Sequence, residues 1–236
     1  MADATNKIAL VTGAGTGVGR AASLALMNSG FTVVLAGRRM EMLEETKKLG
    51  DNVGKSLCVS ADMTSPASIA ALFDKVKETY GRLDVLFNNA GMTVKRASIE
   101  DVDIDEWKRV VDTNLTGPLL CTREAFRIMK AQGGGRIINI SSVAGYLPIP
   151  ENGAYGTSKF ALNGFSQILN EEGKHHGVRV TIVDVGATMT DMSRDRFDPA
   201  DMLRPEDIAE SVLDAARRPL HVRIDEVRIL PPKGIL

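Results

Sequence analysis

Thr12-Gly13-Ala14-Gly15-Thr16-Gly17-Val18-Gly19 follows directly on an apolar, β-branched run at 8–11 and opens a stretch with helical spacing. Glycines at such a turn let the backbone approach a pyrophosphate, which then lies at the positive N-terminus of the helix. The spacing fits T-G-x-x-x-G-x-G and departs from G-x-G-x-x-G. A tight connection without a ligand would also use glycines. The place after the first strand favours a dinucleotide site contacted by Gly13, Thr16, Gly17 and Val18.

The rest of the chain alternates between short apolar runs and longer segments with helical periodicity. Several of the runs are apolar on both faces, which is typical of strands covered above and below. The alternation predicts an α/β fold, a Rossmann-like three-layer sandwich with a doubly wound parallel sheet of about seven strands, in one domain over residues 1–236. The predicted strands lie at 8–11, 31–35, 56–59, 85–87, 137–140, 178–183 and 226–229, and the predicted helices at 18–28, 40–49, 65–79, 104–130, 155–174 and 205–216.

The end of the second predicted strand indicates the form of the coenzyme. A site for NAD usually carries an acidic residue here, which accepts hydrogen bonds from the ribose 2′-hydroxyl. This chain instead reads Leu35-Ala36-Gly37-Arg38-Arg39. A carboxylate would repel a 2′-phosphate, whereas a guanidinium binds it through paired, charge-assisted hydrogen bonds. The two arginines could simply begin a solvated helix, but we favour NADP(H) over NAD(H), with Arg38 as the main contact and Arg39 as a helper.

Asp62 and Met63 follow the third predicted strand, where a coenzyme's adenine edge would be read. An aspartate at this place could equally cap the helix predicted from residue 65. We place both residues in the cofactor site and leave the capping alternative open.

Tyr155 and Lys159 lie four residues apart in a predicted helix and therefore share one face. A free tyrosine titrates near pH 10, so it is a poor base at neutral pH unless a neighbouring cation favours the phenolate. Lys159 supplies such a cation. Tyr155 would then donate a proton to a carbonyl oxygen during reduction and remove one from an alcohol during oxidation.

Three other motifs give this pair its weight. Ser141-Ser142 follows the fifth predicted strand, where a hydroxyl could hydrogen-bond the reacting oxygen. Asn88-Asn89-Ala90-Gly91 follows the fourth predicted strand, and Asn114 lies within the predicted helix at 104–130.

Together these motifs resemble the short-chain dehydrogenase/reductase family over essentially the whole chain, in the family's order and approximate spacing. The resemblance implies an oxidoreductase that transfers a hydride between NADP(H) and a carbonyl or secondary alcohol. It makes Ser142, rather than Ser141, the catalytic serine. It also implies that Lys159 binds the nicotinamide ribose, and that Asn89, Ala90 and Gly91 lie along the coenzyme.

Asn114 resembles the family's fourth catalytic residue, whose main-chain carbonyl holds a water linked to the lysine. A local argument agrees with this role. Pro118 has no N–H, and in an α-helix its acceptor would be the Asn114 carbonyl. That carbonyl is then available to a water, although a helix kink without any chemistry would look the same in sequence.

The resemblance is imperfect after the sixth predicted strand. The family usually has Pro-Gly there and a threonine four residues on, but Val185 precedes Gly186 in this chain, while Thr190 is retained. Either Thr188 or Thr190 could bind the carboxamide or the diphosphate. A short charged segment at about 189–204 is expected to cover the substrate. Leu147 and Met189, with Ser142 and Tyr155, are expected to contact it.

The composition gives no sign of nucleic-acid, membrane or metal partners. The formal net charge of −1 gives no reason to expect nucleic acid or an anionic membrane, and no apolar run approaches the ~18 residues of a membrane span. The N-terminal residues 1–7 lack the features of an export signal, so we expect a cytoplasmic protein. The histidines and cysteines show no metal-ligand spacing.

Two other functions remain to be weighed. An NADP-binding sensor or scaffold without turnover would be expected to lose the serine, tyrosine or lysine, and this chain retains all three. A sugar-nucleotide epimerase or dehydratase would need a larger C-terminal substrate domain. Members of the resembled family are often homodimers or homotetramers, which we expect here as well.

Overall fold

The computed structural model describes residues 6–50, 55–193 and 197–234. Residues 1–5, on which the expected absence of an export signal partly rests, lie outside the described residues, as do 194–196 of the expected covering segment. The strands are β1 (Ile8–Thr12), β2 (Thr32–Gly37), β3 (Ser56–Ser60), β4 (Val85–Asn88), β5 (Gly135–Ile140), β6 (Val178–Val185) and β7 (Glu226–Ile229). The helices are α1 (Gly17–Asn28), α2 (Met40–Gly50), α3 (Pro66–Tyr80), α4 (Ile104–Val111), α5 (Gly117–Gln132), α6 (Gly153–Gly173) and α7 (Pro205–Arg217).

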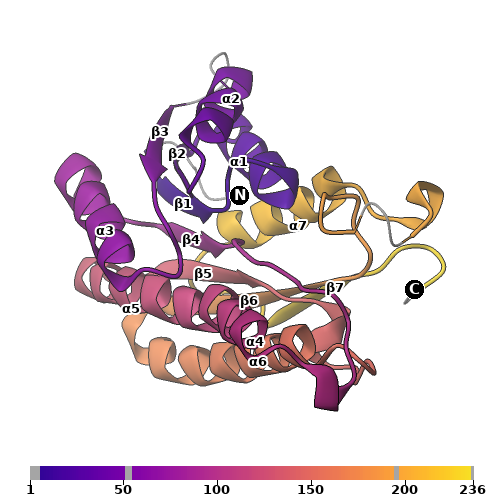
Figure 1. Cartoon of the computed structure of the whole chain (residues 1–236). Coiled ribbons are helices and arrows are strands. Elements are labelled where there is room, and N and C mark those ends of the chain that lie inside the picture. The colour runs from indigo at the N-terminus through magenta and orange to yellow at the C-terminus, as the bar shows by residue number, and fades with distance from the viewer. Residues whose placement is uncertain (1–5, 51–54, 194–196, 235–236) are drawn as a thin grey trace.

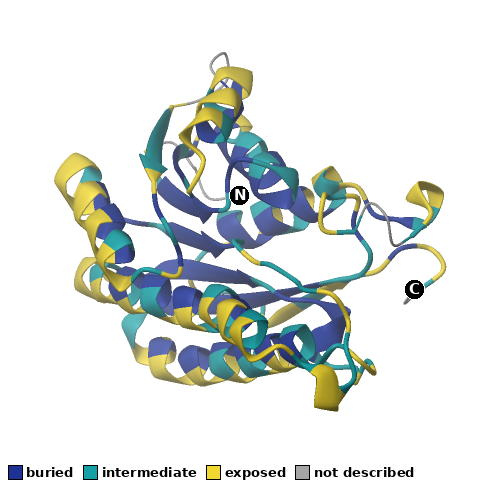
Figure 2. Cartoon of the chain, viewed as in Figure 1, coloured by how far each residue is buried: buried dark blue, intermediate teal, exposed yellow. Residues whose placement is uncertain are grey.

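The described strands form one seven-stranded sheet in the order β3-β2-β1-β4-β5-β6-β7, and every pair in it is parallel. Helices α1, α2 and α7 pack on one face, and α3, α5 and α6 pack on the other (Figure 1). The central strands are dark blue in Figure 2 because both of their faces are covered. The predicted doubly wound α/β sandwich is confirmed.

The strand order reverses between β1 and β4, because the chain winds outward to β3 and then returns to the other side of β1. In open parallel sheets, a ligand crevice forms beyond the carboxyl ends of the strands at such a switch point. The topology therefore places the glycine-rich turn after β1 beside the Asn88-Asn89-Ala90-Gly91 turn after β4.

The helix predicted at 104–130 is wrong as a single α-helix. A π-helical segment, Asp112–Thr116, separates α4 from α5. A π turn closes hydrogen bonds over one more residue than an α turn, as the bond from the Gly117 N–H to the Asp112 carbonyl shows. Pro118 lies just beyond the segment, and because it has no N–H, one backbone hydrogen bond of the helix is missing there.

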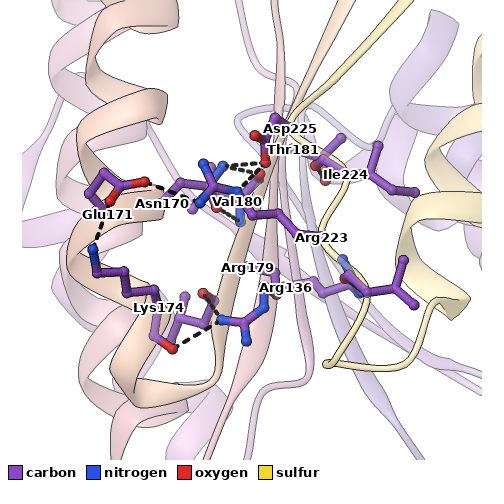
Figure 3. Close-up of polar contacts among 12 residues, drawn as sticks. Arg136, Asn170, Glu171, Lys174, Arg179, Val180, Thr181, Arg223, Ile224 and Asp225 are labelled. Atoms are coloured by element: carbon purple, nitrogen blue, oxygen red, sulfur yellow. Dashed lines mark hydrogen bonds and ion pairs between the residues drawn. The ribbon is translucent and has the colours of Figure 1, made fainter.

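Helix α6, which carries Tyr155 and Lys159, is fixed to β6 near its C-terminal end (Figure 3). Asn170 donates from Nδ2 to the Val180 carbonyl and accepts from the Val180 N–H at Oδ1, both at 2.8 Å. Strand β7 pairs with β6 only from Ile182 onward, so the Asn170 amide takes the place of a strand partner for Val180. These two bonds fix the C-terminal end of α6 to the sheet, and thereby help to position Tyr155 and Lys159 near the N-terminal end of the same helix.

Candidate active site

A cavity of about 810 Å³ opens at the carboxyl ends of the strands and collects the turns after β1 through β6 together with the start of α6. Nearly all of the predicted site residues line it. They are Gly13, Thr16, Gly17, Val18, Arg38, Arg39, Asp62, Met63, Asn89, Ala90, Gly91, Ser142, Tyr155, Lys159, Gly186, Thr188, Met189 and Thr190. Asn114 and Leu147 are absent from the lining.

The turn after β1 is fixed to the turn after β4 by hydrogen bonds. The Thr12 hydroxyl accepts from the backbone N–H groups of Asn89 and Ala90, each at 3.0 Å. The Asn89 amide donates to the Thr12 carbonyl at 2.9 Å. Gly13 takes a positive φ of 66°, a conformation that glycine adopts without steric cost. The glycine-rich turn is therefore rigidly held before any ligand arrives.

Gly19 shows how closely the chain passes itself at this point. A Cβ on Gly19 would lie 2.2 Å from the Gly13 carbonyl oxygen and 2.5 Å from the Asn89 amide nitrogen. Helix α1 begins at Gly17 and has no acidic residue in its first turn to oppose an anion. Free N–H groups at a helix N-terminus, with small residues around them, fit the pyrophosphate of a dinucleotide.

Arg38 and Arg39 are exposed at the end of β2, and both line the cavity. Helix α2 begins at Met40, so the two arginines precede the helix that the alternative interpretation assigned to them. Their guanidinium groups bring positive charge to this end of the cavity, where they could bind an anion.

Asp62 does not cap the following helix, because the N-cap of α3 is Ser65, whose hydroxyl accepts from the Ser68 N–H. Asp62 instead accepts from the Thr64 N–H and the Thr64 hydroxyl, both at 2.9 Å. The bond from the Thr64 N–H, followed by the Thr64 hydroxyl and the positive charge of Arg38, holds the pKa of Asp62 below its usual value. A charged carboxylate therefore stands near Arg38 at the adenine end of the cavity.

Lys159 is buried, one helical turn beyond Tyr155 on α6. Its Nζ lies over the Tyr155 ring, 5.7 Å from the centroid, and donates to the Ile140 carbonyl at 2.9 Å. Burial lowers the pKa of the Lys159 ammonium to about 8, and the Asp184 carboxylate acts in the opposite direction. The predicted pairing of lysine and tyrosine on one helix face is thus present in the structure.

Ser142 is buried at the end of β5 and accepts from the Ala144 N–H at 3.2 Å, which caps the short 3₁₀ turn Val143–Gly145. Its hydroxyl shares the cavity with Tyr155 and Lys159. Three polar groups thus meet where a small carbonyl compound could enter, and such an arrangement can stabilise and protonate a reacting oxygen.

Asn114 lies behind the cavity, fully buried in the π segment. Its amide accepts from the Met92 N–H and donates to the Met92 carbonyl, both at 2.8 Å, and also donates to Ser158 at 3.2 Å. The side chain therefore joins the segment after β4 to α6. Its predicted catalytic role belongs to the main-chain carbonyl and stays a prediction.

The expected covering segment leaves and rejoins the body of the protein at one point. The Met189 N–H donates to the Leu203 carbonyl at 2.8 Å, and the Leu203 N–H donates to the Ala187 carbonyl at 2.9 Å. Between these bonds, Met189, Met192 and Phe197 line the cavity. The described part of the segment thus borders the cavity.

Sequence reasoning missed several lining groups, including Arg96, Asn152 and Glu206. It also missed Asp184, a carboxylate with no exposed surface at the end of β6. An aspartate closing an otherwise apolar run was the available signal, because such a residue needs a partner when it is buried.

Within residues 6–50, 55–193 and 197–234, no group of three or more His, Cys, Asp or Glu side chains could hold a metal ion. In the same part of the chain, every helix is too short or too polar to cross a membrane.

Comparison with known proteins agrees with this geometry. Residues 7–201 match the family model described as short chain dehydrogenase. An uncharacterized oxidoreductase of Staphylococcus aureus is 35% identical over 230 residues, which cover 96% of this chain and 98% of the relative. The crystal structure of a metagenomic short-chain oxidoreductase in complex with NADP is similar with a TM-score of 0.87 and 33% identity, covering 97% of this chain and 98% of that one. Levodione reductase superposes with a TM-score of 0.90 at 27% identity, covering 96% of each chain.

Proposed function

Because the chain belongs to the short-chain dehydrogenase family of oxidoreductases, we propose that it transfers a hydride between NADP(H) and a carbonyl or secondary alcohol, with Tyr155 as the general acid and base. One observation carries the proposal. Ser142, Tyr155 and Lys159 line the same cavity as the glycine turn that fits a pyrophosphate. Binding and chemistry thus have one location.

Ser142, Tyr155 and Lys159 have different roles at the reacting oxygen. Ser142 holds this oxygen through its hydroxyl, and Tyr155 gives it a proton in reduction or takes one from it in oxidation. The Lys159 ammonium, over the Tyr155 ring, favours the phenolate form of Tyr155. Lys159 also binds the nicotinamide ribose. The nicotinamide, when bound, supplies or accepts the hydride. A water on the Asn114 carbonyl would return the proton through Lys159.

Preference for NADP(H) rests on Arg38, with Arg39 as a helper. Both are exposed cations at the end of β2, where an acidic residue would serve NAD(H). The NADP complex of the metagenomic relative supports the same choice. The remaining cofactor contacts come from Gly13, Thr16, Gly17, Val18, Asp62, Met63, Asn89, Ala90, Gly91, Gly186, Thr188 and Thr190, which line the cavity.

The substrate is a small molecule held between Ser142, Tyr155 and the covering segment at about 189–204, which includes Met189. Leu147 is absent from the cavity lining, so it would contact the substrate only if this part of the chain moved when the substrate binds. The protein works as a single domain in the cytoplasm, as a homodimer or homotetramer.

A panel of aldehydes, ketones and oxo acids, with NADPH or NADH consumption followed by absorbance, tests the proposal. At least one carbonyl should be reduced, and Tyr155→Phe should lower its kcat by about 10²- to 10⁴-fold while coenzyme binding persists. Turnover that survives Tyr155→Phe would refute the role of this residue. NADPH binding without any turnover would instead support a sensor or scaffold.

A further inference from the structure

A second group of polar side chains lies behind Lys159, away from the reacting oxygen. Asp184, with no exposed surface, accepts at Oδ1 from the Asn163 amide at 3.3 Å. Asn163 lies one helical turn beyond Lys159, so Tyr155, Lys159 and Asn163 occupy successive turns on one side of α6. The tyrosine–lysine pair therefore continues inward to a buried carboxyl group.

The packing around this carboxyl group is tight. A Cβ on Gly145 would lie 2.8 Å from both the Ser141 hydroxyl and the Asn163 amide nitrogen, and the Gly145 carbonyl accepts from that amide at 3.2 Å. Asp184 Oδ2 is shielded from solvent and has no hydrogen-bond partner among the described atoms. Burial raises the pKa of Asp184, while the Asn163 amide and then the Ser141 hydroxyl act in the opposite direction.

Charged groups reach Asp184 from two elements. Lys159 comes from α6, and its Nζ donates to the carbonyl of Ile140, whose register partner Val183 directly precedes Asp184. Arg228 and Glu226 come from β7, where Arg228 is the register partner of Asp184. Arg228 is exposed, pairs with Glu226 and stacks on the Tyr146 ring at 3.8 Å. Lys159 is buried, so its charge is the less screened of the two cations.

Burial raises the pKa of Asp184 and lowers that of Lys159. Burial thus disfavours both charges, and the Asp184 carboxylate favours the charged form of Lys159. The bond from Asn163 keeps the carboxylate in place, because it favours the charged form of Asp184.

We propose that Asp184 is a positioning residue, a buried counter-charge held by Asn163 that keeps Lys159 protonated beneath Tyr155. Its importance for catalysis rests on the proposed function, because only a tyrosine that acts as acid and base needs that cation. The coupling between the two charges exists without coenzyme or substrate.

Competitive trace acetylation measures this coupling directly. The coenzyme-free protein is labelled with a limiting amount of acetic anhydride across a pH series, and the extent at Lys159 is read by mass spectrometry. Asp184→Asn, which removes the charge at constant volume, should lower the pKa of Lys159 by about one unit. Asp184→Glu, which keeps the charge but lengthens a tightly packed side chain, should lower it less than Asp184→Asn does.

Glu226→Gln is the matched control, because it removes an exposed carboxylate that faces Asp184 from β7 and should leave Lys159 unchanged. An unchanged Lys159 pKa in Asp184→Asn would overturn the proposal. If Asp184→Asn does not fold, Asn163→Ala takes its place and should lower the pKa by a smaller amount, and no change would again overturn it.

The pH profile of alcohol oxidation, which needs the Tyr155 phenolate, provides the second readout. Loss of the lysine cation raises the pKa of Tyr155, so the acid limb of kcat/KM for oxidation should move to higher pH in Asp184→Asn. A uniform loss of rate with an unmoved limb would mean that Asp184 only supports packing. If no carbonyl is turned over, the acetylation result still decides the charge coupling, so the two proposals fail separately.

Discussion

Buried polar groups at the two ends of the sheet differ in how completely they are hydrogen-bonded. At the amino end, Asn170 satisfies both backbone groups of Val180, and Thr181 donates to the Ile224 carbonyl at 2.7 Å (Figure 3). At the carboxyl end, Lys159 and Asp184 are buried with fewer partners than they can bind. Polar groups join elements of the fold at the amino end, whereas at the carboxyl end a buried lysine borders the cavity and a buried carboxylate lies behind it.

Arg136 shows that even the amino end contains a costly charge. It is 2% exposed and donates to the carbonyls of Arg218, Pro219 and Val222. Burial, and then the nearby Arg179 and Arg218, lower its pKa to about 10, and its Nη1 has no partner among the described atoms. Three carbonyl contacts nevertheless join β5 to the chain after α7, which is a structural task.

Asn170→Ala gives the largest expected effect, and it should fall on stability. The substitution leaves the buried N–H and carbonyl of Val180 unpaired, which should lower the free energy of unfolding by roughly 3 to 4 kcal/mol. Urea denaturation measures the loss. Lys174→Ala, which removes an exposed ion pair with Glu171 on the same side of the molecule, is the control and should change little. A large loss of kcat in folded Asn170→Ala would blur the distinction between the two ends.

Lys159 should make the carboxyl end pH-dependent in the opposite sense to a stabilising lysine. The pKa of Lys159 is about 8 in the folded protein and 10.5 without burial. Below pH 8 the side chain is charged in both the folded and the unfolded protein, so the full free-energy cost of burying that charge opposes folding. Between these values the unfolded chain holds more protons, and stability therefore rises with pH. The full change is about 3 kcal/mol.

Urea denaturation of the coenzyme-free protein and of Lys159→Met at pH 7, 8.5 and 10 isolates this contribution. The wild-type protein should gain stability relative to Lys159→Met as the pH rises. A difference between the two proteins that is constant with pH would show that Lys159 is not penalised by burial.

Arg38→Asp should have the smallest of these effects, and it should be confined to the choice of coenzyme. Loss of a charge-assisted contact should lower the ratio of kcat/KM with NADPH to that with NADH by about 10- to 100-fold. Arg39→Asp should lower it less. Thermal melting without coenzyme should be unchanged, because Arg38 is exposed. An unaltered ratio would remove Arg38 from the coenzyme site.

Much of the fold could be predicted because its signals are periodic or local. Strands apolar on both faces and the turn from Thr12 to Gly19 indicated a parallel sheet with a site at its carboxyl edge. The tyrosine–lysine spacing predicted a shared helix face, which the structure has.

The remaining features depend on contacts between distant residues. A π turn adds only one residue to a helix, so the segment at Asp112–Thr116 looked like continuous helix. The bond between Asn163 and Asp184 joins α6 to β6 and has no local signature. Spacing along the chain also could not show that Lys159 donates to the Ile140 carbonyl.

The π segment also determines where this chain tolerates a change of length. Deleting one residue elsewhere in α4 or α5 would rotate one part of the helix by about 100° relative to the other and expose its buried face. A deletion within Asp112–Thr116 would be absorbed, because the wide turn would contract to an ordinary α turn. Asn114 would then turn away from Met92. In terms of chain length, this extra residue is dispensable for the helix and serves to hold the Asn114 amide against the backbone of Met92.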